Sequence, residues 1–172
     1  MSLSRIKNGT IYDPANGVNG EVRDLWIQDG KIIDRPPNAD SFSGKTLDAT
    51  GYVVMPGGID MHCHIAGPKV NAGRKMTPDL KRTAPPIYRG EHTRSGTGGV
   101  VPSTFATGYL FASIGYTTAM DAAIPGLHAR HAHEELQDTP ILDKGFYLLF
   151  GNNHFVMKHL RNQDQNALDA YC

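Results

Sequence analysis

One stretch of the sequence, residues 55–74 (MPGGIDMHCHIAGPKVNAGR), constrains most strongly what this chain can fold into. An apolar approach and two glycines lead into Asp60, His62 and His64, which alternate with apolar residues. Side chains of a β-strand alternate between its two faces, so these three polar side chains are expected on the same face. The stretch therefore predicts a β-strand that presents two imidazoles side by side.

Two imidazoles on one strand face can share a single divalent metal. Zinc is the usual metal for such ligands, and a catalytic zinc typically has three protein ligands plus water. A pair of hydrogen-bonded core histidines is the alternative interpretation. The polar residues that follow, Lys69, Asn71 and Arg74, favour a functional site. The sequence therefore predicts His62 and His64 as metal ligands.

The pattern PGGID-x-H-x-H at residues 56–64 resembles the first barrel strand of the amidohydrolase superfamily. The extension IAGPKVNAGR at residues 65–74 is similar to that of the A subunits of formylmethanofuran dehydrogenases and the alpha subunits of bacterial formyltransferase/hydrolase complexes. This resemblance implies an enzyme that hydrolyses, or reversibly forms, the N-formyl group of a methanofuran-type one-carbon carrier. Its implied partners are that carrier and the other subunits of such a complex.

The resemblance also implies a centre of two divalent metals, usually zinc, at the C-terminal mouth of the barrel. In this family the first-strand histidines hold one metal, a carboxylated lysine on the fourth strand bridges both, and a later aspartate shuttles the proton. Only His62 and His64 can be placed on this sequence, and the lysine and aspartate are expected beyond Cys172. The chain alone is therefore expected to be inactive, because two ligands fall short of three.

Two other functions stay open at this point. A cyclic amidohydrolase of the hydantoinase or dihydropyrimidinase kind would share the histidine motif, although residues 66–71 (AGPKVN) argue against it. A non-catalytic barrel remnant that docks against partner subunits would need no complete metal centre. Turnover of a formylated carrier and of cyclic amides would separate the two enzymes.

Composition narrows the class further. Lysine plus arginine and aspartate plus glutamate are balanced at 17 each, so neither nucleic acid nor an anionic membrane is indicated as a partner. Two cysteines make no disulfide framework, which is typical of a reducing compartment. The N-terminus lacks the apolar region of a signal peptide, and no apolar run approaches the ~20 residues of a membrane span. A cytoplasmic protein is expected.

The expected fold is α/β and has two parts. Residues 1–54 are predicted to be the N-terminal part of a small β-sandwich, with hairpin turns at Asn8-Gly9 and Asp29-Gly30. Residues 55–172 are predicted to be about the first three units of a partial TIM-type (β/α) barrel, since a complete barrel needs ~250 residues.

Within the second part, strands and helices are expected to alternate as in a parallel sheet. A long connection without clear periodicity is expected over residues 65–101. The predicted helices cover residues 102–114, 127–137 and 155–171, and the predicted strands cover residues 116–123 and 146–150. The second of these strands is continuously apolar, which predicts burial on both faces.

Further site candidates follow the ends of the predicted strands, where barrel enzymes place their active sites. Cationic or amide side chains after the histidine motif could hold an anionic group of a substrate. Amide side chains after residue 150 could donate to a carbonyl or formyl oxygen, or could instead begin a helix, since Asn is a good N-cap. The substrate-binding candidates are Lys69, Asn71, Arg74, Asn152, Asn153 and His154.

Four other polar residues are candidates for a functional site because of their positions in the sequence. Asp121 could support a ligand histidine or cap the turn at residues 124–126, and the sequence slightly favours the cap. His131 and His133 lie two helical positions apart, about 200° around the axis, so they cannot share a metal. His128 stays open as an active-site residue.

Overall fold

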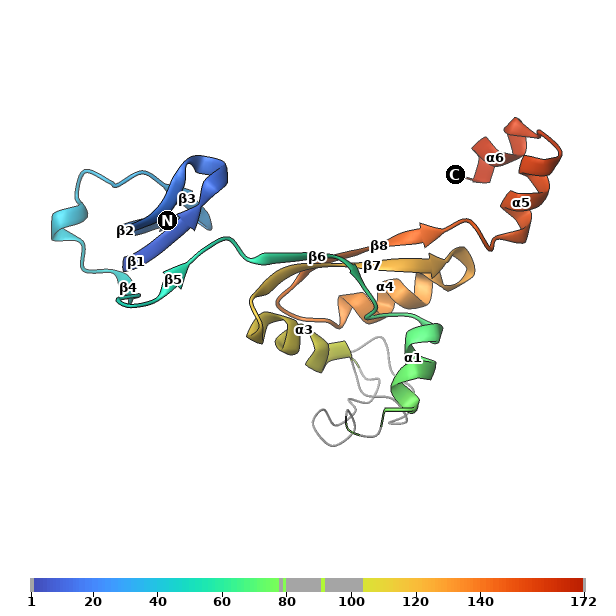
Figure 1. Cartoon of the computed structure of the whole chain (residues 1–172), viewed down its shortest axis with the longest axis horizontal. Coiled ribbons are helices and arrows are strands. Elements are labelled where there is room, and N and C mark those ends of the chain that lie inside the picture. Colours follow the sequence, from blue (N-terminus) through green and yellow to red (C-terminus); the bar gives the residue numbers. More distant parts are fainter. Residues whose placement is uncertain (1, 78, 80–90, 92–103, 172) are drawn as a thin grey trace. The chain divides into compact units, whose positions relative to one another are not determined.

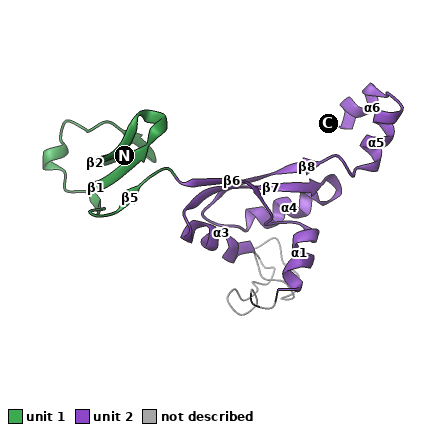
Figure 2. Ribbon diagram, viewed as in Figure 1, with its two compact units in different colours: residues 1–56 green, residues 57–172 purple. Residues whose placement is uncertain are grey.

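The computed structural model describes residues 2–77, 79, 91 and 104–171. The chain divides into two compact units, residues 1–56 and 57–172 (Figure 2). Among the described residues, the regular elements of unit 1 are strands and short 3-10 helices, whereas unit 2 alternates strands with α-helices. In the described part of the chain, no helix has the length and apolar character needed to cross a membrane.

Unit 1 is a five-stranded sheet organised around its first strand (Figure 1). β1 (Leu3–Asp13) pairs antiparallel with β2 (Val18–Gln28), and β2 pairs antiparallel with β3 (Lys31–Ile33). β1 also pairs in parallel with β4 (Lys45–Asp48) and with β5 (Val53–Val54). The described strands of this unit form one sheet, so the second layer of the sandwich stays a prediction.

The expected hairpin at Asn8-Gly9 is wrong. β1 runs straight through both residues, and its register with β2 shifts between Ile6 and Gly9, which marks a β-bulge. Asn8 adopts a φ of 61°, the left-handed conformation of a bulge residue. A Cβ on Gly9 would lie 2.7 Å from Cγ2 of Val54, so this glycine permits close packing against the neighbouring strand.

Two turns complete the antiparallel part of this sheet. The chain first reverses at a 3-10 helix, Pro14–Asn16, which ends at Gly17 with a φ of 72°. The expected hairpin at Asp29-Gly30 is confirmed, because Gln28 pairs with Lys31 and both turn residues have positive φ.

Unit 2 is built on a three-stranded parallel sheet in the order β6-β7-β8. Its strands are β6 (Gly58–Cys63), β7 (Tyr116–Pro125) and β8 (Asp143–Leu149). Parallel strands need crossover connections, and helices fill them here. The α/β class is therefore confirmed, whereas the described strands form an open sheet and the barrel stays a prediction.

The helices of unit 2 follow the strands in turn (Figure 1). α1 (Pro68–Lys75) and α3 (Thr104–Ser113) lie between β6 and β7, and α4 (Ala129–Gln137) lies between β7 and β8. α5 (His154–Arg161) and α6 (Gln165–Tyr171) follow β8. The expectation of a connection without periodicity after the histidine motif is thus wrong for residues 68–75, and most of residues 78–103 lie outside the described part.

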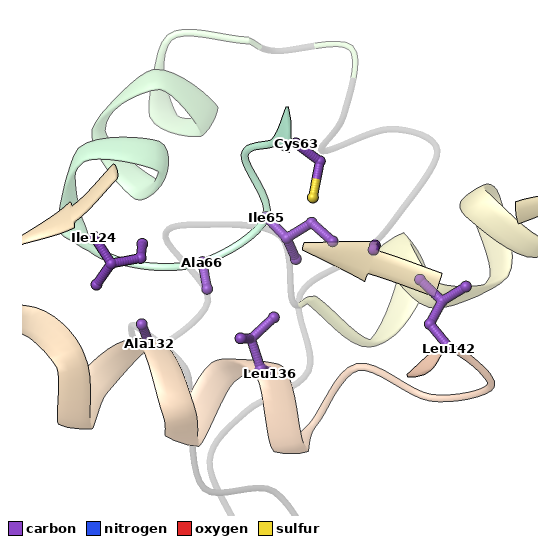
Figure 3. Packing of buried hydrophobic residues seen from close by; sticks show 8 residues of the cluster. Cys63, Ile65, Ala66, Ile124, Ala132, Leu136 and Leu142 are labelled. Atoms are coloured by element: carbon purple, nitrogen blue, oxygen red, sulfur yellow. The ribbon is translucent and has the colours of Figure 1, made fainter. Parts of the chain in front are cut away.

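The apolar core of unit 2 lies between the sheet and α4 (Figure 3). It joins the end of β6, the middle and end of β7, the inner face of α4 and the segment before β8. Its buried members are Cys63, Ile65, Ala66, Ala119, Ile124, Ala132, Leu136 and Leu142. Because three of these residues lie at or directly after the C-terminal end of β6, the core anchors the segment that follows the histidine pair.

The expectation that residues 146–150 are buried on both faces is wrong. Phe146 packs against the core, but Tyr147 and Leu148 are 46% and 44% exposed. β8 is an edge strand of the described sheet and pairs only with β7. Helix α4 contacts β8 and β7, and the apolar sequence alone could not show that only part of this strand is covered.

Gly108 in α3 is a position where packing demands the absence of a side chain. A Cβ there would lie 2.1 Å from the carbonyl oxygen and 2.8 Å from Cδ of Pro140, and neither group can rotate away. We expect Gly108→Ala to lower the free energy of unfolding by about 1–3 kcal/mol, as other overpacked positions do. Urea denaturation measures this change.

Gly73 in α1 provides the matched control, because a Cβ there meets no atom of the described residues within 4 Å. Gly73→Ala should leave stability unchanged or raise it by up to about 1 kcal/mol through helix propensity. Equal effects of the two substitutions would contradict the packing role of Gly108.

Candidate functional site

The histidine pair lies at the carboxyl end of β6. His62 is the penultimate residue of this strand and His64 follows it directly. Their ring centroids are 5.4 Å apart with an interplanar angle of 83°, and both residues are exposed. The pairing of β6 with β7 is irregular between Asp60 and Cys63, yet the two imidazoles lie next to each other. Their role as metal ligands stays a prediction.

The neighbours of the pair have other tasks. Asp60 uses Oδ1 to accept a hydrogen bond of 3.0 Å from the backbone N–H of His62. Cys63 is buried in the core, and this burial, together with the charges of Asp121 and Asp60, raises the pKa of its thiol to about 12. The thiolate is the form of cysteine that binds metals. Cys63, as a protonated thiol, is therefore a residue of the apolar core.

Asp121, in the middle of β7, reaches across to the segment after the histidine pair. Its side chain is fully buried, and its Oδ2 accepts hydrogen bonds from the backbone N–H groups of Ile65 (2.7 Å) and Ala66 (2.6 Å). Burial raises the pKa of Asp121, while the two N–H groups, His64 and Arg74 act in the opposite direction. The slightly favoured expectation that Asp121 caps the turn at residues 124–126 is wrong, since its hydrogen bonds lead to Ile65 and Ala66, which follow β6.

The second oxygen of Asp121 bears on whether a metal fits here. Asp121 Oδ1 is buried, has no hydrogen-bond partner in the described part of the chain, and lies 3.8 Å from Nδ1 of His64. A carboxylate oxygen beside the second ring nitrogen is the usual support of a metal-bound histidine. The described residues contain no cluster of three or more His, Cys, Asp or Glu side chains that could hold a metal. The described residues thus supply two imidazoles and one buried carboxylate at this place.

A second buried carboxylate, that of Glu135 in α4, binds two groups of the segment that follows Ala66. Its oxygens accept hydrogen bonds from the backbone N–H of Gly67 and from Nδ2 of Asn71, the latter at 2.6 Å. Its side chain is 5% exposed. No sequence motif pointed to Glu135. An acidic residue between Ala132 and Leu136, both core positions of the same helix, is the signal that could have identified it.

The three candidates of α1 have different environments. Lys69 is exposed, whereas Asn71 and Arg74 are 6% and 9% exposed. The Asn71 amide is hydrogen-bonded to Glu135, and Nη2 of Arg74 donates to Oγ1 of Thr107 at 3.1 Å. Burial lowers the pKa of Arg74, and the nearby carboxylates act against this shift.

A cavity of about 600 Å³ opens at the carboxyl ends of β6 and β7. Ionisable side chains line one part of it, and apolar residues of α3 and of residues 122–125 line another. The ionisable lining residues are His64, Lys69, Arg74, Asp121 and His128. Ligands of parallel α/β sheets bind beyond the carboxyl ends of the strands, so this cavity is the candidate substrate site.

His128, His131 and His133, which lie in α4 or just before it, have different environments, as expected. His128 lines the cavity, and its buried Nδ1 has no hydrogen-bond partner among the described residues. Nε2 of His131 lies 3.3 Å from Glu135, whereas the ring of His133 packs on Phe146 at a centroid distance of 4.5 Å. His131 and His133 therefore have different neighbours, and only His128 belongs to the cavity wall.

The candidates after β8 do not line this cavity. Asn152 and His154 are exposed, and His154 is the first residue of α5. Asn153 caps α5, because its Oδ1 accepts from the backbone N–H groups of Phe155 and Val156. The helix-start interpretation is thus confirmed for Asn153.

Replacement of Asn153 tests this capping role. Asn153→Ala should lower the free energy of unfolding by about 1 kcal/mol, since two N–H groups lose their acceptor. Asn153→Asp keeps the acceptor and should retain most of the stability, although it loses the 2.6 Å bond from Nδ2 to the Tyr171 hydroxyl. Thermal unfolding measures both variants. Loss of stability to the same extent in both would contradict the cap.

The fold and the site together define an α/β protein with a histidine pair at the carboxyl edge of a parallel sheet. The chain belongs to the amidohydrolase family, whose family model matches residues 45–171. Over 167 residues it is 50% identical to the protein FwdA of Methanocaldococcus jannaschii, a match that covers 96% of this chain and 28% of that protein.

Two further comparisons concern one bacterial assembly, the formyltransferase/hydrolase complex Fhc of Methylorubrum extorquens. Over 165 residues the chain is 38% identical to the A subunit of this complex, covering 93% of this chain and 28% of that protein. The structure of the present chain is similar to that of one chain in the crystal structure of FhcABCD from the same organism in complex with methylofuran. That match has a TM-score of 0.73 and 34% identity, and it covers 94% of this chain and 28% of the other. The chain thus spans 28% of the length of these relatives.

Proposed function

We propose that this chain forms part of the active site of a zinc-dependent amidohydrolase that cleaves, or reversibly forms, the N-formyl group of a methanofuran-type carrier, with formate as the other product. The observation that carries the proposal is the adjacent pair His62 and His64 beside the cavity. The similarity to the A subunit of the Fhc complex, and the methylofuran in the similar crystal structure, support the carrier.

His62 and His64 would hold one metal through their imidazole nitrogens, and the centre would contain two divalent metals, most simply zinc. A bound divalent ion polarises a carbonyl oxygen and activates water for attack on it. Asp121 would support this centre, because its Oδ1 lies 3.8 Å from Nδ1 of His64. The bridging lysine and the proton-shuttling aspartate would come from other residues than those described.

Lys69 would be the residue of α1 that meets the carrier. Its ammonium is exposed at the cavity wall, where it can attract an anionic group without breaking an internal bond. Arg74 lines the same cavity, but it is buried and bonded to Thr107, so it would contribute positive potential from a fixed position.

Other subunits of a formyltransferase/hydrolase or formylmethanofuran dehydrogenase complex would be the protein partners.

Formate release by the full-length protein tests the proposal. The protein would be purified with its complex, stripped of metal with a chelator, and assayed with formylated furan carrier, with hydantoin and with dihydrouracil. We expect formate from the carrier only, loss of this activity on stripping, and recovery on addition of zinc. Turnover of the cyclic amides in place of the carrier would contradict the substrate. Full activity after verified metal removal would contradict the metal dependence.

A further inference from the structure

We propose that Asp121 and Glu135 act together as a two-carboxylate clamp that fixes the turn between β6 and α1, and thereby positions His64 and Lys69. The proposal rests on the proposed function, which assigns metal binding to His64 and carrier binding to Lys69. Asp121 and Glu135 are positioning residues in this scheme, because they act through the turn.

The clamp binds three consecutive backbone amides. Asp121 takes the N–H groups of Ile65 and Ala66, and Glu135 takes that of Gly67. All three amides are in buried residues, so each needs a partner inside the protein. Gly67 has a φ of 92°, a conformation that favours glycine. A strand and a helix that are both distant in sequence therefore hold one short turn.

The arrangement is costly, which argues that it does more than fill space. Both carboxylates are nearly inaccessible to solvent, and removing a polar group from water costs free energy that its hydrogen bonds must offset. Replacing buried ionic groups by apolar ones of similar size is often neutral or stabilising in proteins. A turn that only had to connect β6 to α1 would not need two buried carboxylates.

Asp121 connects the clamp to His64. Its Oδ2 accepts from the backbone N–H of Ile65, the residue after His64. Its Oδ1 has no hydrogen-bond partner among the described residues and lies 3.8 Å from Nδ1 of His64. A small rotation of the imidazole would bring Nδ1–H into hydrogen-bond range of Oδ1. That bond would fix the ring orientation and leave the other ring nitrogen for the metal.

Glu135 connects the clamp to Lys69. One of its oxygens holds the amide of Gly67 and the other holds the side chain of Asn71, so both bonds flank the first turn of α1. Lys69 lies between these two points. Asn71 is therefore the partner of the clamp, which explains why its amide is buried although it follows the histidine motif.

An exchange of the two partners tests the Glu135 side. Asn71→Asp places a second carboxylate against Glu135 and removes the donor, so the turn should open. Adding Glu135→Gln restores the pairing, because the glutamine oxygen can accept from Gly67 N–H while its amide donates to the new carboxylate. In the full-length protein, we expect Asn71→Asp to lower zinc affinity, but by less than the loss of about 10–100-fold that follows removal of a direct partner of a metal ligand, because Asn71 acts on His64 only through the turn. The double variant should regain most of the affinity.

Asp121→Asn tests the other side. Its amide nitrogen must face either the two backbone donors or the His64 ring, so one contact of the clamp is lost. Zinc affinity should fall within the same range of about 10–100-fold. Matched controls are Glu134→Gln, the neighbouring and more exposed acid of α4, and Asp143→Asn, an exposed acid at the start of β8. Both should leave zinc affinity unchanged.

Two readouts separate the possible outcomes. Hydrogen exchange of the peptide that contains residues 65–67 reports the turn without any metal, and competition with a chromophoric chelator reports zinc affinity. The expected result for Asn71→Asp is faster hydrogen exchange together with weaker zinc binding. Both effects should be reversed when Glu135→Gln is added. Unchanged zinc affinity in Asn71→Asp and Asp121→Asn would overturn the positioning role. A protein that binds no zinc would defeat the proposed function, whereas unchanged exchange at residues 65–67 would defeat the clamp itself.

Discussion

Substitution of His62 or His64 by asparagine is expected to lower the zinc affinity of the full-length protein more than about 100-fold, and formate release with it. Loss of a group that only supports a ligand costs about 10–100-fold, so loss of a direct ligand should exceed this range. The two rings lie 5.4 Å apart on one edge of the sheet, and removal of either would leave a single imidazole there. Metal content after dialysis against a chelator measures the effect.

His133→Asn is the control for this experiment. His133 is exposed on α4 and packs on Phe146, away from the residues that line the cavity. Its replacement should leave zinc content and formate release unchanged. A His62 or His64 variant that retains zinc as tightly as the native protein would contradict the assignment of the pair as metal ligands.

The second large effect is expected for stability. Asp121→Ala removes the acceptor of two buried amides, those of Ile65 and Ala66. Each unsatisfied buried donor costs about 1–3 kcal/mol, so the free energy of unfolding should fall by roughly 2–6 kcal/mol for the two donors. This is a large share of the roughly 5–15 kcal/mol typical of a domain. Urea denaturation measures it, with Asp143→Ala on the exposed start of β8 as the control within about 0.5 kcal/mol.

The pH dependence of stability provides an independent check on Asp121. Burial raises the pKa of Asp121 in the folded state above that of the unfolded chain. The folded state then binds more protons, so this group makes stability fall as pH rises from the unfolded pKa to the folded one, and its contribution is constant above that. Asp121→Asn should remove this component. A pH profile identical to that of the native protein would contradict a raised pKa.

Local rules were sufficient for several elements. The period of two residues placed His62 and His64 together on one strand edge, although the ladder there is irregular. The alternation of strand and helix patterns predicted the α/β class of unit 2. The hairpin at Asp29-Gly30 and the cap at Asn153 follow from the conformational and hydrogen-bonding preferences of single residues.

The same rules failed where distant segments compete for a residue. Asn8-Gly9 has the composition of a turn, but the partner strands β4 and β5 extend β1 through it and leave a bulge. Asn71 and Arg74 follow the histidine motif as exposed ligand-binding residues would, yet α1 turns them inward toward Glu135 and Thr107. Sequence proximity to a motif did not reveal the direction of the side chains.

The sequence by itself determined the family, through its motif. It also determined the alternation of strands and helices in unit 2 and the histidine pair, because backbone geometry imposes these last two patterns on neighbouring residues. Only the tertiary structure decided which polar group satisfies which buried amide. Asp121 meets its partners 56 and 55 residues away, and Glu135 meets Gly67 68 residues away. Such pairings exist only after the parallel strands and α4 have packed, since a buried N–H group takes whatever acceptor the fold brings within reach.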